Sequence, residues 1–152
     1  MIVRFANLKD KESVLKLLDE LSDYGNFLQV IIKKSQKAQK KGGPIYEALI
    51  NRDDIKIFVA EEKSEVVALA TFYFIPSIRR GFNRGLIEDF IVTGRMRGKG
   101  IGGKLLSGVK QFCKTNRIKN FKLSSGLELM DAHRFYEKNG GIFAGKLFRF
   151  DL

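Results

Sequence analysis

The residues able to do chemistry gather in one stretch, positions 86–107. It opens with LIEDFIV, a largely apolar run that predicts a buried strand with Glu88 and Asp89 in its middle. Burying a carboxylate costs free energy unless it is paired or hydrogen-bonded, so either acid could serve structurally, held by loop backbone or an arginine. Either could equally act as a general base, because burial raises a carboxyl pKa toward the working range. Both interpretations stay open for each residue.

A glycine-rich turn follows this strand at once. Glycines at positions 98, 100, 102 and 103 are interleaved with Arg95, Arg97 and Lys99. Apolar residues then recur at helical spacing from Ile101 to Phe112, so a helix is expected to begin within the glycines. The first turn of a helix carries unbonded N–H groups and about half a positive charge, and glycines let a phosphate approach them. The pattern predicts a diphosphate cradle, with a plain connecting turn as the alternative.

Two common nucleotide motifs fit this turn poorly. A Walker A loop needs Ser or Thr after Gly-Lys, but Leu105 follows Lys104, so the hydroxyl that would bind Mg²⁺ is missing. Residues 98–103 do match GxGxxG, the dinucleotide fingerprint. That fold wants an acid at the end of the next strand, whereas the predicted strand 121–125 ends in two serines.

Three segments of the chain resemble signatures of the GNAT superfamily of acetyl-CoA-dependent N-acetyltransferases. Residues 97–102, RGKGIG, match its R/Q-x-x-G-x-G/A motif, and IEDFIV resembles its central strand. Residues 132–140, AHRFYEKNG, resemble its A-x-x-F-Y-E-K-x-G motif. The resemblance implies that the cradle holds the pyrophosphate of coenzyme A. It further implies direct transfer of acetyl to a primary amine of a small molecule or peptide, in a ternary complex.

The resemblance also implies roles for individual residues. Glu88 would be the general base that deprotonates the amine, with Asp89 as second choice, and Tyr136 would protonate the departing thiolate. Strand alternation places Glu88 on the side of Phe90 and Val92. Leu129 stands where many members carry Asn or Arg, which puts a pantetheine contact there in question. Contacts with the cofactor are expected from Phe90, Ile91, Val92, Arg97, Gly98, Lys99, Gly100, Ile101, Gly102 and Lys138.

Length and composition limit the other possibilities. The 152 residues suit one domain, residues 1–152, with a real core. No apolar run is long enough to span a bilayer and residues 1–12 lack a signal peptide's apolar centre, so we expect no membrane association. A single cysteine, Cys113, excludes an internal disulfide and suits a reducing cytoplasm. With His133 as the one histidine, neither a zinc site nor a Cys–His nucleophile pair can be assembled, so no metal is expected.

The net charge of +11 suits polyanionic partners. Coenzyme A is one such partner. Nucleic acid is a less favoured one, because the chain contains no recognised nucleic-acid motif and no Trp. A non-catalytic acyl-CoA sensor that keeps the cradle is a further alternative. The oligomeric state is left open, a homodimer included.

The remaining pattern predicts a mixed α/β (α+β) fold with a largely antiparallel central sheet, and the resemblance implies helices on both faces. Asn7 or Asp10 should cap the first helix, and Tyr24-Gly25 should break it. A second helix should start at Phe27, carry a basic tail and stop at Gly42-Gly43, and Pro44 should open a short third helix through Ile50. The other expected elements are strands 2–5, 55–60 and 66–75 (the last two a hairpin), a loop over 77–85 holding Arg79, Arg80 and Arg84, a strand at 121–125, a helix at 131–138, and a final strand or pair of strands over 142–151.

Overall fold

The structure is a computed structural model that describes residues 1–28 and 38–152, with side chains described outside 24–40. Its strands form one sheet in the order β1-β2-β3-β4-β5. All neighbours pair antiparallel except β4 and β5, which are parallel, so the predicted largely antiparallel sheet is confirmed. The strands are β1 (Ile2–Phe5), β2 (Ile55–Glu62), β3 (Glu65–Ser77), β4 (Phe82–Val92) and β5 (Phe121–Leu123). The helices are α1 (Lys11–Leu28), α2 (Ala38–Leu49), α3 (Ile101–Thr115) and α4 (Met130–Lys138).

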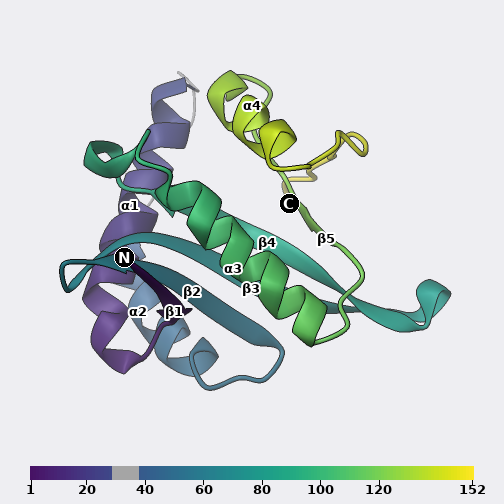
Figure 1. The fold of residues 1–152 in the computed structure, drawn as a ribbon, viewed down its shortest axis with the longest axis horizontal. Coiled ribbons are helices and arrows are strands. Elements are labelled where there is room, and N and C mark those ends of the chain that lie inside the picture. Colours follow the sequence, from purple (N-terminus) through teal and green to yellow (C-terminus); the bar gives the residue numbers. More distant parts are fainter. Residues whose placement is uncertain (29–37) are drawn as a thin grey trace.

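Helices cover both faces of the sheet (Figure 1), as the family resemblance implies. On one face, Val14 and Leu17 of α1 and Tyr46 of α2 bury against residues of β2, β3 and β4. On the other face, Leu105 and Val109 of α3 are fully buried against the same strands. Edge-to-face aromatic pairs, with ring centroids 5.0–6.3 Å apart, tie α3 to the sheet on this side through Phe5, Phe58, Phe72, Phe74, Phe112 and Phe121.

The start of α1 is fixed by polar contacts, as its sequence predicts. The Asn7 side chain accepts from the Lys9 N–H, and Asp10 reaches back to the Asn7 N–H, which forms a capping box before a short 3₁₀ turn, Leu8–Asp10. The Arg4 guanidinium donates to both Asp10 and Glu61, which ties β1 to β2 and to this turn. Arg4 lowers the pKa of the nearly buried Asp10 carboxyl.

Three predicted helix boundaries are wrong. The helix α1 continues through Tyr24-Gly25 to Leu28, and so takes in Phe27. The helix α2 likewise runs through Gly42, Gly43 and Pro44 instead of starting at Pro44. At Gly43 an added Cβ would lie 3.2 Å from Cε of Lys11, so the missing side chain lets the two helices approach closely. The middle of the predicted second helix and most of its basic tail fall in 29–37, outside the described residues.

Strands β2, β3 and β4 are longer than predicted, and β3 and β4 form a second hairpin. Strands β2 and β3 meet at Lys63 and Ser64, which both have positive φ, and β3 continues through Pro76 to Ser77. The predicted loop 77–85 contains only a short 3₁₀ turn, Ile78–Arg80, and Arg84 belongs to β4, opposite Ile75. Figure 1 shows this hairpin of β3 and β4 projecting beyond the rest of the sheet.

The predicted final strand or strands over 142–151 are wrong. No residue of 141–152 is assigned to a strand or helix, and each one is exposed. A strand needs a neighbour to satisfy its backbone groups, and among the residues that the structure describes this segment has none, whatever its pattern favours. Among the described helices, none is long and apolar enough to cross a membrane.

Candidate active site

A β-bulge lies at the two acids of β4. Ala70 pairs with Phe90 and Phe72 pairs with Ile87, so Glu88 and Asp89 together face Thr71. As a result Ile87 and Phe90, three positions apart, both contact the core beneath α3. The prediction that plain alternation sets Glu88 on the side of Phe90 is therefore wrong, because the extra residue interrupts the period of two.

The bulge fixes Asp89 firmly. The hydroxyl of Thr71 donates to Oδ2 of Asp89 at 2.7 Å, and the backbone N–H of Asp89 donates to the same hydroxyl at 2.9 Å. Burial raises the pKa of Asp89, and the hydrogen bond from Thr71 offsets part of that effect. The Asp89 carboxyl is thus fixed by a hydrogen bond and largely shielded from solvent.

Glu88 differs from its neighbour because its side chain is exposed. Tyr73, two residues beyond Thr71 on β3, lies near both acids. Its pKa is raised, first by burial and then by the charges of Asp89 and Glu88. A group of two carboxylates and a phenol therefore lines the middle of β4, and of the two acids Glu88 is the one a solute can reach.

Beyond the bulge, β4 loses its neighbour on one side. Strand β5 pairs with β4 only over residues 85–87. The N–H groups of Asp89 and Thr93 point to β3, where they bond to Thr71 and Val67. Backbone direction alternates along a strand, so the N–H groups of Phe90 and Val92 point to the side that β5 has left. This opening exposes strand backbone at the place where the resemblance expects the cofactor.

The glycine turn forms the predicted helix start. Gly98 and Gly100 have φ of +75° and +76°, which side chains rarely adopt, and no other group lies within 4 Å of where their Cβ atoms would be. Gly100 is the N-cap of α3, and the first bond within the helix runs from the Lys104 N–H to the Gly100 carbonyl, at 3.1 Å. The N–H groups of residues 101–103 therefore have no partner inside the helix.

A contact from α1 holds the turn in place. One oxygen of the Glu20 carboxylate accepts from the Gly94 N–H at 2.7 Å, and the other accepts from the Thr93 hydroxyl at 2.9 Å. Glu20 also lies 3.6 Å from the Arg97 guanidinium, whose Nε donates to the Val92 carbonyl at 2.9 Å. Sequence reasoning missed Glu20, since an acid on a helix 73 residues upstream carries no local signal. Arg97 remains a predicted cofactor-binding residue, and its guanidinium contacts Glu20 and the Val92 carbonyl.

Helix α4 closes the opening from the other side. Tyr136 lies with its ring centroid 6.1 Å from that of Phe90, and Phe135 lies 5.8 Å from the same ring. An added Cβ at Gly102 would be 3.3 Å from the Phe135 ring, so the start of α3 fits closely against α4. Burial raises the pKa of Tyr136 to about 12, so its hydroxyl keeps its proton at neutral pH.

The other residues predicted to contact the cofactor lie around the start of α3 and α4. Ile101 is buried in the core below α3, and Ile91 is buried on the opposite face against α1 and α2, where a contact through its side chain is not available. Lys99 lies exposed on the turn and Lys138 exposed at the end of α4. The structure therefore brings together Phe90, Val92, Gly102 and Tyr136, whereas Glu88 lies exposed at the bulge, off the side of Phe90.

His133 and Cys113 take no part in this arrangement. A ring nitrogen of His133 lies 2.9 Å from the Gly126 carbonyl, within a hydrogen bond that orders the loop before α4. Cys113 is 4% exposed in the core, and burial raises its pKa to about 11, so it is a packing residue. Within the described ranges, no three His, Cys, Asp or Glu side chains are grouped to bind a metal ion.

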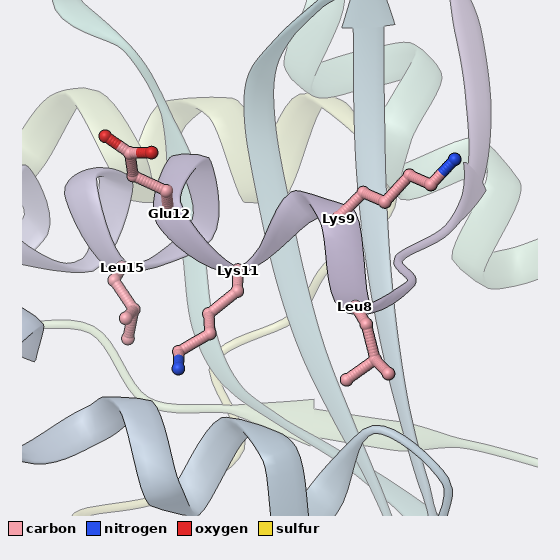
Figure 2. Close-up of a pocket in the computed structure, with 5 residues that line it drawn as sticks. All are labelled: Leu8, Lys9, Lys11, Glu12 and Leu15. Carbon is pink, nitrogen blue, oxygen red and sulfur yellow. The ribbon is translucent and has the colours of Figure 1, made fainter.

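Two hollows on the surface have linings that do not include Glu88, Asp89 or Tyr136. One, about 440 Å³, lies at the start of α1. Figure 2 shows Leu8, Lys11 and Leu15 pointing to one side of the backbone and Lys9 and Glu12 to the other, so the charged groups of this hollow do not converge. The second, about 350 Å³, borders the glycine turn. Its lining includes three basic side chains, Lys63, Arg95 and Lys99, and two acidic ones, Glu62 and Glu65, of which Glu65 is paired with Arg95.

The profile of the Acetyltransferase (GNAT) family matches residues 20–141, a span that runs from Glu20 through the bulge and the glycine turn to the end of α4. The chain belongs to the GNAT family. Two N-acetyltransferases of Bacillus subtilis (strain 168), both described as uncharacterized, are similar in sequence. YhdJ is 33% identical over 104 residues, 68% of this chain and 72% of YhdJ. YhfO is 26% identical over 144 residues, 92% of this chain and 89% of YhfO.

Solved structures show the same GNAT fold. A tetramutant of the BH1408 protein from Bacillus halodurans superimposes over all of both chains with a TM-score of 0.86 at 20% identity. An aminoglycoside acetyltransferase, meta-AAC0020, from an uncultured soil metagenomic sample, superimposes with a TM-score of 0.74 at 16% identity over 99% of this chain and 94% of that one. At these identities the likeness shows the fold alone. Together with the family match, it makes this chain an acetyltransferase by family.

Proposed function

We propose that this chain transfers acetyl from acetyl-CoA to a primary amine of a small molecule or peptide, by direct transfer in a ternary complex. The observation that carries the proposal is the opening between β4 and β5. Three features support it: the pairing of β4 with β5 ends at residue 87, the phenol of Tyr136 lies beside Phe90, and α3 begins at a glycine.

The residues of the turn fit the diphosphate of coenzyme A. Free N–H groups at positions 101–103 point out of the start of α3, and the side-chain-free positions Gly98 and Gly100 leave room for phosphate oxygens. Lys99, exposed on the turn itself, adds a positive charge beside them. The backbone N–H groups of Phe90 and Val92 would hold the rest of the cofactor along β4 as a strand holds its neighbour, and that of Val92 would donate to the thioester oxygen.

The general base and the general acid lie on different elements, Glu88 on β4 and Tyr136 on α4. Bound acetyl-CoA supplies a thioester whose C–S bond breaks as the C–N bond to the amine forms. Glu88, exposed at the bulge, takes a proton from the ammonium group of the acceptor, directly or through water. Tyr136, kept protonated by burial, donates its proton to the departing sulfur. Asp89 is engaged with Thr71, which suits it to shaping the bulge and attracting a cationic acceptor.

Substitution of the acid and the base tests these roles. Glu88→Gln is expected to lower kcat by roughly 10²–10⁴-fold, and Tyr136→Phe by a similar or smaller factor, with coenzyme A affinity nearly intact. Coenzyme A formation should be followed by chromatography over a panel of amino sugars, polyamines, aminoglycosides, amino acids and peptides, and affinity by calorimetry with acetyl-CoA against NAD and ATP. Glu12→Gln, the same change at an exposed position on α1, is the matched control and should keep full turnover.

Each outcome decides one part of the proposal. Unchanged turnover in Glu88→Gln would remove Glu88 as the base. Binding of acetyl-CoA with no turnover on any amine would favour a sensor over an enzyme. Absence of acetyl-CoA binding would overturn the site itself.

A further inference from the structure

Two segments far apart in the sequence carry seven basic side chains to one end of the sheet. Residues 79–84, RRGFNR, form the turn of the β3–β4 hairpin and the start of β4. Residues 114–122, KTNRIKNFK, run from the end of α3 into β5. Neither segment contains an acid, although the whole chain has 17 Asp and Glu. The seven side chains, which we call the basic cluster, are Arg79, Arg80, Arg84, Lys114, Arg117, Lys119 and Lys122.

Contacts between β4 and β5 join the two segments. The Gly85 N–H donates to the Asn120 carbonyl at 2.9 Å, where the pairing of the two strands begins. The Lys119 ammonium lies 4.9 Å from the centre of the Phe82 ring, a cation–π contact. Figure 1 shows the β3–β4 hairpin projecting beyond the sheet, with the end of α3 and the start of β5 near its base. No local motif predicts this surface, because it exists only where the fold joins the two segments.

The arginines of the basic cluster differ from the others in the chain. The structure describes all ten arginines, and each of the six outside the cluster forms an ion pair with an Asp or Glu. Among the described residues, the four inside the cluster have no acidic partner. The Nε of Arg84 is buried and, within the same ranges, has no hydrogen-bond partner at all. Unpaired like charges and an unsatisfied N–H both cost free energy, so the cluster is suited to an anionic partner that supplies acceptors.

We propose that the basic cluster binds double-stranded DNA, with the tip of the β3–β4 hairpin in the major groove. A two-stranded ribbon fits this groove, which is about 12 Å wide. Residues 82–85 extend by about 10 Å at roughly 3.3 Å per residue, which exceeds the groove depth of about 8.5 Å. Arg79 and Arg80, exposed at the tip, then reach the base edges. The cluster members at the hairpin base, on 114–122, meet the phosphates on either side.

Duplex DNA fits the basic cluster better than other polyanions do. Four of its seven members are arginines, whose planar fork donates two hydrogen bonds to a phosphate or to guanine. The major groove of A-form RNA is deep and narrow, so it excludes a ribbon. Membrane binding scales with buried apolar area, and at the tip only Ile78 is a fully exposed apolar side chain. In a DNA groove the same side chain can contact the methyl group of thymine.

Salt-dependent binding to a labelled duplex, followed by fluorescence anisotropy, tests the basic cluster. Seven phosphate contacts predict a slope of about −6 for log K against log salt. The double substitution Arg79→Gln and Arg80→Gln should weaken binding by about 10–100-fold at low salt and reduce the slope by about two. Arg134→Gln with Arg149→Gln removes the same charge from exposed arginines outside the cluster, so this matched control should bind nearly as the wild type does. Thermal melts check that both variants fold.

A neutral substitution tests whether the tip enters the groove. Ile78→Ser changes no charge, so it should leave the salt slope unchanged while weakening binding by about 2–10-fold, the value of one small apolar contact. Unchanged affinity in this variant would contradict entry of the tip into the groove.

Several outcomes would overturn the proposal. One is no binding of the duplex at low salt. Another is an equal loss in the two arginine variants, which would show attraction by net charge alone. Tighter binding to an RNA duplex or a single strand of the same sequence, or binding to anionic vesicles without binding to DNA, would assign the basic cluster to a different polyanion. These measurements involve no coenzyme A, so they stand apart from the proposed activity.

Discussion

The two edges of the sheet, at β1 and at β5, differ in how fully their strands are paired. On the β1 side, every residue of β1 pairs with β2, and the Arg4 guanidinium satisfies two carboxylates at once. On the β5 side, only three residues pair with β4, and the strand backbone beyond them stays open. The first side gains rigidity because its polar groups have partners inside the chain. The second leaves backbone of β4 without a neighbouring strand, and this is where we propose that the cofactor binds.

The β1 side should govern stability. Removing Arg4 leaves Asp10 nearly buried without its cation, so Arg4→Met is expected to cost about 2–3 kcal/mol of unfolding free energy in urea melts at pH 7, with turnover per folded molecule unchanged. Arg4 lowers the pKa of Asp10 below its ordinary value of 3.8, so the loss should be complete above that value and shrink as pH falls below it.

Arg52→Met is the matched control for this change. Arg52 also forms a two-bond ion pair, with Asp54, but both side chains are about half exposed. Such surface pairs contribute little, so no measurable change is expected. Equal losses in the two variants would contradict the assignment of stability to the Arg4 contacts.

The short pairing of β4 with β5 should be the place where stability and activity are coupled. At Gly85 an added Cβ would lie 2.3 Å and 2.5 Å from Phe72 ring carbons and 2.6 Å from Cβ of Phe121. Gly85→Ala should therefore cost about 1–3 kcal/mol and, by shifting β5, weaken acetyl-CoA binding as well. Gly108→Ala is the comparison on the β1 side, where the new Cβ meets a Val3 methyl at 2.8 Å; it should leave acetyl-CoA affinity unchanged.

The smallest effect is expected at the bulge. Burial raises the pKa of Asp89, so its contribution to stability is fully present below the ordinary value of 3.8 and declines as pH rises through the raised one. Asp89→Asn should thus melt at a somewhat higher temperature than the wild type at pH 7, and the difference should fade toward pH 3. A difference that grows as pH falls would contradict a raised pKa.

Local patterns of the sequence predicted most elements of this fold. The glycine turn, the start of α3, the hairpin of β2 and β3, and helix α4 each follow from neighbours within a few positions. The bulge at Glu88 and Asp89 could not be predicted, because it is defined by pairing with β3 and leaves the sequence pattern unaltered. Glu20 was missed for the same reason, since its partners lie more than 70 residues away. The strands predicted over 142–151 were wrong, because an alternating pattern does not by itself supply a neighbouring strand to pair with.

The burial of Cys113 has a practical consequence for the bench. It is the one cysteine of the chain, and it lies inside the core with its pKa raised to about 11. Since thiolates are the reactive form, Cys113 should not react with a thiol-specific dye while the protein is folded. Any early colour from a thiol-reactive dye during turnover then comes from released coenzyme A alone. A slow rise in colour without substrate reports unfolding of the protein.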